Sequence, residues 1–337
     1  MNDLLVAGAG PAGLATAIHA ARAGLKVTVV ERRPGPIDKA CGEGLMPHTL
    51  RHLDALGITL HGKPFRGITY LDRTRRVEAR FPGGAGRGVR RTVLSEALHD
   101  AAATAGVRIV KGDIGDITQD ATGVRAGGFE ARYLAAADGL HSPIRRQLGL
   151  DRPTNGGRRW GIRRHFQIAP WTDTVEVYWA AHTEAYVTPV ADDCVGVAIL
   201  TSRQGKFDDH LREFPALAAR LTGAQGTRAR AAGPLRQRAS SQHRGRVMLV
   251  GDAAGYVDAL TGEGLGIALG CAELVVNSVL ADDPADYTRQ WRRMSRRYRL
   301  LTSALLTASN SPDRTMIVPA ATTLPSVFNQ AVKLLAQ

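Results

Sequence analysis

The first thirty residues contain two short apolar runs on either side of a segment with helical spacing. Residues 4–6 are apolar, and residues 14–23 carry apolar side chains at helical spacing. A second apolar run, 26–30, ends at Glu31. This order predicts a strand, a helix and a second strand, which together make a βαβ unit with parallel strands.

Further segments of both kinds follow along the chain. Helical spacing predicts helices over 47–56, 92–105, 264–281, 287–307 and 324–335. Short apolar or alternating runs predict strands at 65–70, 77–81, 107–111, 114–118, 123–126, 131–137 and 246–250. Between 155 and 240 the alternation is typical of β-structure, with strands over 160–168, 174–179, 185–190 and 194–201. We therefore expect an α/β protein that contains a β-rich insert.

The turn after the first strand is rich in glycine. A glycine at position 8 allows a tight turn, one at 10 lets a pyrophosphate approach the backbone, and one at 13 permits close packing of helix and strand. The following helix offers free N–H groups to an anion at its N-terminus. Glu31, at the end of the second strand, is placed to accept hydrogen bonds from a ribose. These residues (Gly8, Gly10, Pro11, Ala12, Gly13 and Glu31) predict a dinucleotide site.

Two more acidic residues follow predicted strands. Asp138 comes before Gly139, and Asp252 comes after Gly251. Taken singly, each aspartate is also explained as an ordinary helix N-cap. Together with Glu31 they place three carboxylates at strand ends of one sheet, where α/β folds bind dinucleotides.

Composition and charge restrict the class of protein. The chain has 337 residues, is 44% hydrophobic and carries a net charge of +13. Only six of its 44 basic residues are lysines, and the arginines are dispersed without interleaved aromatic residues, so we expect no nucleic-acid partner. We find no apolar run long enough to span a membrane and no leader peptide. The three cysteines (Cys41, Cys194 and Cys271) are far apart, which favours a cytoplasmic protein without a metal site.

Three motifs follow one another along the chain: the glycine motif at 8–13, Asp138-Gly139 and Gly251-Asp252. In this order they resemble the fingerprints of the FAD-dependent oxidoreductases of the p-hydroxybenzoate hydroxylase-like superfamily. The resemblance implies that the glycine motif holds the FAD pyrophosphate and that Glu31 binds the adenosine ribose. It places Arg91 near the flavin and its phosphates, and Asp252 on the ribityl chain. The residues expected to bind FAD are Gly8, Gly10, Pro11, Ala12, Gly13, Glu31, Arg32, Cys41, Gly42, Arg91, Asp138, Gly139, Gly251, Asp252, Gly262, Glu263, Gly264 and Leu265.

The resemblance also implies a domain organisation. A Rossmann-type FAD-binding domain is expected over 1–64, 83–150 and 241–285. A β-sheet substrate domain is expected over 65–82 and 151–240, and a C-terminal helical segment over 286–337.

Within the superfamily, two segments look like the geranylgeranyl reductase-like branch. They are Thr261-Gly262-Glu263-Gly264 and Cys41-Gly42-Glu43-Gly44. The aromatic run of those reductases is only partly kept, as Tyr186-Val187-Thr188-Pro189, and an aromatic content of 5% argues against the large apolar tunnel that a long polyprenyl substrate would need. The candidate substrate-pocket residues are Trp179, Tyr186, Pro189 and Thr261.

Two reactions remain open at this point, both using FAD with NAD(P)H as electron donor and a small-molecule substrate. The sequence favours a monooxygenase that oxidises an aromatic or polyketide-like compound through a C4a-hydroperoxyflavin. The alternative is an ene-reductase that saturates an isoprenoid or lipid double bond. A non-catalytic flavin-binding or nucleic-acid-associated protein is a distant third reading. Cys41 and Glu43 are candidate catalytic groups, although Cys41 is equally explained as a packing residue and Glu43 as a capping acid.

The predicted helix 287–307 carries six arginines beside Trp291 and two leucines. Such a helix suits the surface of an anionic membrane. The interpretation that we favour is a solvated helix that covers the nucleotide-binding domain. The sequence does not specify the oligomeric state.

Overall fold

The predicted βαβ unit is present, and it forms the centre of a parallel sheet. The computed structural model describes residues 1–33, 35–154 and 157–336. In the unit, β1 (Asn2–Ala7) and β2 (Val27–Glu31) pair in parallel and are joined by α1 (Pro11–Arg22). The sheet has the order β20-β21-β11-β1-β2-β8, and its remaining strands on this path are β8 (Arg108–Lys111), β11 (Phe129–Ala136), β20 (His243–Arg244) and β21 (Val247–Leu249).

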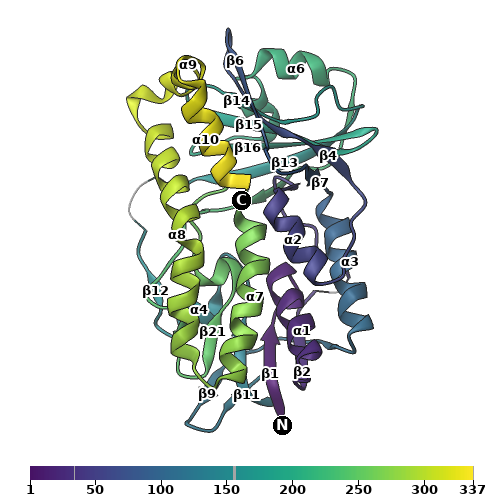
Figure 1. Cartoon of the computed structure of the whole chain (residues 1–337), viewed down its shortest axis with the longest axis vertical. Coiled ribbons are helices and arrows are strands. Elements are labelled where there is room, and N and C mark those ends of the chain that lie inside the picture. Colours follow the sequence, from purple (N-terminus) through teal and green to yellow (C-terminus); the bar gives the residue numbers. More distant parts are fainter. Residues whose placement is uncertain (34, 155–156, 337) are drawn as a thin grey trace.

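Helices cover this sheet in the lower half of Figure 1. Leu4 and Leu5 of β1 and Leu14 and Ile18 of α1 are completely buried. Burial of such side chains stabilises the fold by roughly 1.5–3 kcal/mol each. Helix α1 packs on α3 (Arg91–Thr104) and α7 (Gly264–Leu280), and α7 packs in turn on the long α8 (Pro284–Ser309).

A second sheet occupies the upper half of Figure 1 and has the order β17-β13-β16-β15-β14-β5-β6, with β18 paired to β13. It joins a hairpin from the first hundred residues to strands from the middle of the chain. Its members are β5 (Gly67–Leu71), β6 (Arg76–Arg80), β13 (Trp160–Gln167), β14 (Val175–Trp179), β15 (Thr183–Ala191), β16 (Cys194–Thr201), β17 (Gln225–Gly226) and β18 (Arg230–Ala232). We propose the two-domain division of the chain on this basis; residues 34, 155–156 and 337 of that division lie outside the described residues.

The remaining elements are short, apart from the C-terminal helix. The strands are β3 (Gly44–Leu45), β4 (Lys63–Phe65), β7 (Gly86–Gly88), β9 (Ile117–Gln119), β10 (Val124–Ala126), β12 (Asp151–Arg152) and β19 (Arg238–Ala239). The helices are α2 (Pro47–Ala55), α4 (Pro143–Gln147), α5 (Phe207–Leu211), α6 (Pro215–Leu221), η1 (Gly251–Ala254), η2 (Pro312–Met316), α9 (Ile317–Thr323) and α10 (Pro325–Ala336).

Helices α5 and α6 differ from the sequence prediction, which gave the middle of the chain a β pattern. Both lie against the second sheet, where Phe207, Phe214 and Leu217 are buried with Phe166 of β13. These helices are one and two turns long, too short for a helical period to stand out from the neighbouring β pattern. Within the described residues, no helix combines the length and the apolarity that crossing a membrane requires.

A buried ion-pair cluster connects the second sheet to the C-terminal segment. Glu184 of β15 is fully buried and lies 2.8 Å from the Arg159 guanidinium and 3.0 Å from that of Arg314 in η2. Arg159 also lies 3.0 Å from the carboxylate of Asp258. Because both arginines are almost completely buried, each depends on a carboxylate for its charge balance.

We expect Glu184→Gln to destabilise the protein by roughly 3–5 kcal/mol, because it leaves two buried guanidinium groups short of negative charge. Urea unfolding of the FAD-loaded protein measures this loss. The matched control is Asp173→Asn, which breaks the exposed 2.6 Å pair with Arg80 and is expected to cost about 1 kcal/mol or less. Equal losses in the two variants would contradict the buried-cluster argument.

Candidate functional site

The glycine motif forms the turn between β1 and α1, and its three glycines differ in what surrounds them. Gly8 has φ +104°, and a Cβ there would lie 2.6 Å from the Ala137 oxygen. A Cβ on Gly13 would lie 1.9 Å from the Gly8 oxygen, so this position requires glycine for packing. Gly10, in contrast, has no atom within 4 Å of a built Cβ. Gly10 is also the N-cap of α1 and offers no side-chain cap, which leaves the first N–H groups facing open space.

Glu31 lies beside this turn and is nearly buried. Its carboxylate accepts hydrogen bonds from the backbone N–H groups of Ala9 (2.8 Å) and Arg33 (3.0 Å). Burial alone would raise the pKa of Glu31, but these two hydrogen bonds and the Arg33 charge hold it below its ordinary value. The group is therefore ionised at neutral pH and can accept further hydrogen bonds from ribose hydroxyls.

A cavity of about 90 Å³ opens between the turn and Glu31. The predicted residues Gly8, Gly10, Glu31, Arg32 and Asp138 all line it, together with Arg33 and Lys39, which the sequence analysis did not select. Among its described lining residues, the three cations, all from the loop after β2, are matched by the carboxylates of Glu31, Asp113 and Asp138, so the cavity offers acceptors as well as donors.

Asp138 has features of both roles that the sequence left open, a helix cap and a carboxylate that binds a dinucleotide. One of its carboxylate oxygens accepts the Ile144 backbone N–H at 3.1 Å, as a helix-capping group would. The other oxygen is buried without a protein partner, and burial raises the pKa of this carboxyl. Gly139 has φ +88°, and a Cβ there would lie 3.2 Å from the Lys39 ammonium, so the loop brings Asp138 and Lys39 to the same place.

A second group of charges surrounds Asp252, the first acidic residue of η1. Burial raises the pKa of Asp252, while the positive charges of Lys39 and Arg91 oppose this effect. Burial likewise lowers the pKa of Lys39, assisted by the charges of Arg33 and Arg91. Arg91 is 8% exposed and its Nε has no partner in the protein. We propose these groups as the acceptor and the donors for a flavin ribityl chain and its phosphates.

The predicted segment 262–265 forms the start of α7. Gly262 has φ +70° and Gly264 begins the helix, with Leu265 in its first turn. Glu263 is the N-cap residue, and its carboxylate lies 3.0 Å from Nε2 of His48 in α2. This contact holds the Glu263 side chain against α2. The N-terminus of α7 remains available to an electron-rich ligand edge.

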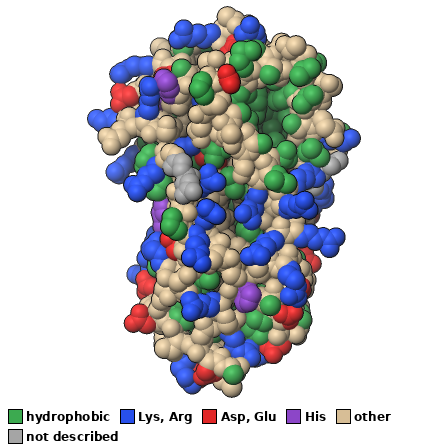
Figure 2. Space-filling view, turned by 90° about the vertical axis from the view of Figure 1, so that its left-hand side faces the viewer, with side chains coloured by type: hydrophobic (Ala, Val, Ile, Leu, Met, Phe, Trp, Pro, Cys, Tyr) green, Lys and Arg blue, Asp and Glu red, His purple; other side chains and the backbone are tan. Residues whose placement is uncertain are grey.

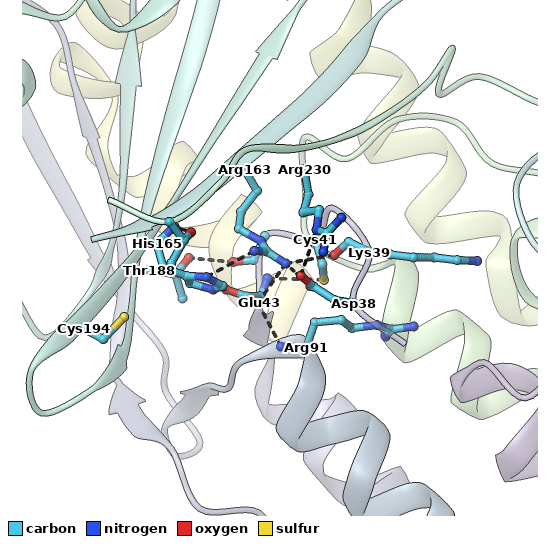
Figure 3. A network of polar contacts seen from close by, with 12 residues as sticks. Asp38, Lys39, Cys41, Glu43, Arg91, Arg163, His165, Thr188, Cys194 and Arg230 are labelled. Atoms are coloured by element: carbon cyan, nitrogen blue, oxygen red, sulfur yellow. Dashed lines mark hydrogen bonds and ion pairs between the residues drawn. The ribbon is translucent and has the colours of Figure 1, made fainter. Parts of the chain in front are cut away.

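Glu43 is the centre of a buried network between the two sheets (Figure 3). It is 2% exposed and has φ +61°, an unusual backbone conformation for a residue with a side chain. Its carboxylate accepts the Arg91 backbone N–H at 2.8 Å and lies 2.6 Å from Nε2 of His165. Arg163 bonds the ring of His165 at 3.1 Å and also pairs with Asp38. Glu43 therefore connects the loop before β3 with the start of α3 and with β13.

Cys41 and Gly42 lie at the edge of this network. The Thr188 hydroxyl donates to the Gly42 oxygen at 2.8 Å, and the Glu43 N–H lies 3.4 Å from Sγ of Cys41. Burial raises the pKa of the Cys41 thiol, and the Arg91 charge opposes this only in part. A Cβ on Gly42 would meet no atom within 4 Å. In Figure 3 Cys41 lies beside Lys39 and near Arg91, on the side of the network that faces the cofactor residues.

The four candidate substrate residues are distributed between two places. Trp179 and Tyr186 belong to one apolar cluster of the second sheet, and the Tyr186 hydroxyl donates to the Leu260 oxygen at 3.0 Å. Thr261 bonds the Thr302 hydroxyl of α8 at 2.8 Å. Pro189 lies farther along β15, where its carbonyl is against Gly88. The first three surround the segment before α7, so we propose these three, rather than Pro189, as substrate neighbours.

Several residues of the site were not predicted from the sequence, most clearly Lys39, Arg163 and His165. A signal for the last two was present, because positions 163 and 165 share one face of the predicted strand 160–168. Both side chains are buried, at 2% and 4% exposure. Charged residues on a buried strand face require partners, and here the partner is Glu43.

The structure fits FAD on three observations. A Cβ built on Gly10 or on Gly42 would meet no protein atom within 4 Å. The Arg91 Nε and one Asp138 oxygen are buried polar atoms without partners. A cavity whose described lining has three basic and three acidic side chains lies at the N-terminus of α1 beside an ionised Glu31. Together they provide donors for the phosphates and acceptors for sugar hydroxyls along one path.

Comparison with known proteins establishes the family. Residues 1–273 match the FAD binding domain family, and the chain belongs to it. The chain is 30% identical over 332 residues to a menaquinone reductase of Mycolicibacterium smegmatis, covering 86% of this chain and 79% of the relative. It is 30% identical over 298 residues to digeranylgeranylglycerophospholipid reductase 1 of Methanothermobacter thermautotrophicus, covering 78% and 73%. A flavoprotein/dehydrogenase of Cytophaga hutchinsonii shares the fold, with a TM-score of 0.79, 20% identity and coverage of 99% and 98%.

The resemblance to the p-hydroxybenzoate hydroxylase-like superfamily and the α/β fold are thus confirmed. The chain is a flavin-dependent oxidoreductase, and FAD is its cofactor.

Proposed function

We propose that this oxidoreductase takes electrons from NAD(P)H and saturates a carbon–carbon double bond of an isoprenoid lipid. The sequence pattern alone favoured hydroxylation, and the similarity to two named reductases moves our preference to the other reaction. Both relatives are named for the reduction of a lipid, and each is similar to this chain over more than two thirds of both lengths.

The observation that carries the proposal is the position and protonation of Cys41. Reduction of a double bond requires a hydride at one carbon and a proton at the other. Bound FAD supplies the hydride chemistry, and the chain must supply the proton. The raised pKa of the Cys41 thiol keeps its proton on sulfur at neutral pH, beside the open space at Gly42. A thiol so placed is able to act as a general acid.

In this proposal Glu43 is a positioning residue rather than the acid. Its carboxylate is occupied by the Arg91 N–H and by His165, with Arg163 at 3.7 Å. These contacts fix the backbone of the segment that carries Cys41. They also exclude water from the side of the network that faces β13.

The apolar surroundings support a lipid substrate. Trp179 and Tyr186 belong to a cluster that extends to Leu301 and Leu305 of α8 and Ile317 of α9, all partly exposed. Figure 2 shows apolar side chains gathered around a hollow in the upper part of the face that carries α8 and α9. Much of this lining is aliphatic, so a low aromatic content does not argue against a long apolar substrate.

The test is an anaerobic assay with FAD-loaded protein, NADPH or NADH, and menaquinone or a digeranylgeranyl phospholipid in detergent. We expect a product that has gained two hydrogens on its isoprenoid chain, together with oxidation of the nicotinamide. Mass spectrometry after re-oxidation in air detects this product, because a quinone ring that has only been reduced to the quinol loses its two hydrogens in air, whereas a saturated chain keeps them. A parallel aerobic assay with simple phenols tests for hydroxylation. Oxygenated products in the aerobic assay, together with no hydrogenated lipid in the anaerobic assay, would contradict the proposal.

A further inference from the structure

A second cavity, of about 330 Å³, lies between α8 and the loop that follows Asp252. Three segments enclose most of it: 236–239, 254–257 and one side of 291–303. Within the described part of the chain, it has no lining residue in common with the nucleotide cavity beside Glu31. Its lining does include Gly251, Asp252 and Gly264, which are among the residues that we expect to bind FAD. Its volume is at the lower end of the range for small-molecule sites.

Arginines surround this cavity. Five of them belong to its lining, and the one acidic side chain among the described lining residues is Asp252. Arg299 lies over the ring of Trp291 at 5.4 Å, and Arg292 donates to the Ser240 oxygen at 3.3 Å. Burial and the positive charges of Arg292 and Arg238 lower the pKa of Arg299. Like charges are thus held together here, and a bound anion would relieve their repulsion. The five are Arg236, Arg238, Arg292, Arg296 and Arg299.

Three buried polar atoms in the same lining have no protein partner. They are Oε1 of Gln242, Nε1 of Trp291 and Oγ of Ser295. Their residues are 3%, 3% and 0% exposed. Buried polar groups in proteins are nearly always hydrogen-bonded, so three orphans around one cavity indicate a missing polar partner.

The orphaned atoms and the arginines are arranged to act together. Trp291, Ser295 and Arg299 are four residues apart in sequence and therefore share one face of α8. The side-chain amide of Gln242 donates to the Ala254 oxygen at 3.2 Å, which leaves its own oxygen as an acceptor. All three atoms are buried behind the cavity wall, so the cavity itself presents mainly guanidinium groups, and a ligand reaches the two donors and the acceptor only when neighbouring side chains shift.

We propose that this cavity is a binding site for a phosphorylated ligand. Arginine forks match phosphate oxygens in a bidentate geometry. The Trp291 N–H and the Ser295 hydroxyl donate to further phosphate oxygens, and Gln242 accepts from a hydroxyl of the ligand. The inference does not depend on the reaction proposed above, because it uses none of the residues assigned to proton transfer.

The test measures inorganic pyrophosphate binding to the FAD-loaded protein by calorimetry. We expect the double variant Arg296→Gln/Arg299→Gln to bind pyrophosphate about tenfold more weakly or worse, because two charge-assisted contacts are lost. The matched control is Arg293→Gln/Arg297→Gln, which removes the same charge from the same helix; all four arginines are exposed, and the two control positions lie outside the lining. We expect its affinity to change by about twofold or less, as for screened surface charges. Trp291→Phe keeps the aromatic ring under Arg299 and should weaken binding through loss of the N–H alone.

The source of the phosphate is distinguished with vesicles. Co-sedimentation with phosphatidylglycerol vesicles that pyrophosphate reverses, and that Arg296→Gln/Arg299→Gln abolishes, identifies a lipid headgroup. Pyrophosphate binding without vesicle binding identifies a soluble phosphorylated compound. Absence of both interactions, or equal losses in the two double variants, would overturn the site.

Discussion

Gly10→Val is expected to give a folded protein that retains no flavin. The backbone at Gly10 has φ −75° and ψ 176°, an extended conformation that valine adopts without strain. A Cβ there meets no protein atom within 4 Å, so the fold itself has room for the side chain. The isopropyl group would instead occupy the space in front of the α1 N-terminus, where we propose that the FAD pyrophosphate binds. We expect affinity for FAD to fall by ~100-fold or more, about 3 kcal/mol, with activity lost in parallel.

Flavin absorbance of the purified protein and titration of the apoprotein with FAD measure this loss. Circular dichroism must show that the variant is folded. The matched control is Gly83→Val, at another glycine with no atom within 4 Å of a built Cβ but outside the nucleotide cavity. Gly13→Val cannot serve this purpose, because its Cβ would overlap the Gly8 oxygen and disturb the fold. Stoichiometric FAD in purified Gly10→Val would remove the assignment of this turn to the pyrophosphate.

Local sequence patterns predicted much of the fold because its elements have strong periods and clear ends. The helix predicted over 14–23 occupies Pro11–Arg22, and the strand predicted over 194–201 occupies Cys194–Thr201. The helix predicted over 287–307 begins earlier, at Pro284, because the Asp283 carboxylate caps the backbone N–H groups of Ala285 and Asp286. That aspartate–proline start is readable in the sequence.

The network around Glu43 was not predictable in the same way. Glu43 and His165 are 122 residues apart, and their 2.6 Å contact depends on how the two sheets pack. A local pattern specifies which face of a strand a residue occupies, but not which distant loop reaches that face. For the same reason Lys39 was overlooked, since it lies in an irregular loop and approaches Gly139 only in the folded chain.

Cys41→Ser is expected to keep its flavin but to lose most lipid reduction. Serine is close to cysteine in size, and the contacts of Thr188 with Gly42 and of Glu43 with Arg91 hold the two residues that directly follow it. A serine hydroxyl is a much weaker acid than a thiol, so proton delivery to the second carbon should slow. General acids contribute about 10²–10⁴-fold to rates, and we expect the turnover number to fall by about 100-fold.

Two measurements separate this role from a structural one. Reduction of the bound flavin by NAD(P)H should be unchanged in Cys41→Ser, because that half-reaction needs no proton from the thiol, whereas reoxidation by the lipid should be slow. In the unsubstituted protein the lipid half-reaction should also decline at high pH as the Cys41 thiol loses its proton, and Cys41→Ser should lack that decline. Cys194→Ser provides the control, since Cys194 is buried at the end of β16 and only approaches the Val195 oxygen. If Cys41→Ser reduces lipid at the full rate, the proton comes from another group; if both half-reactions slow equally, the thiol acts by packing.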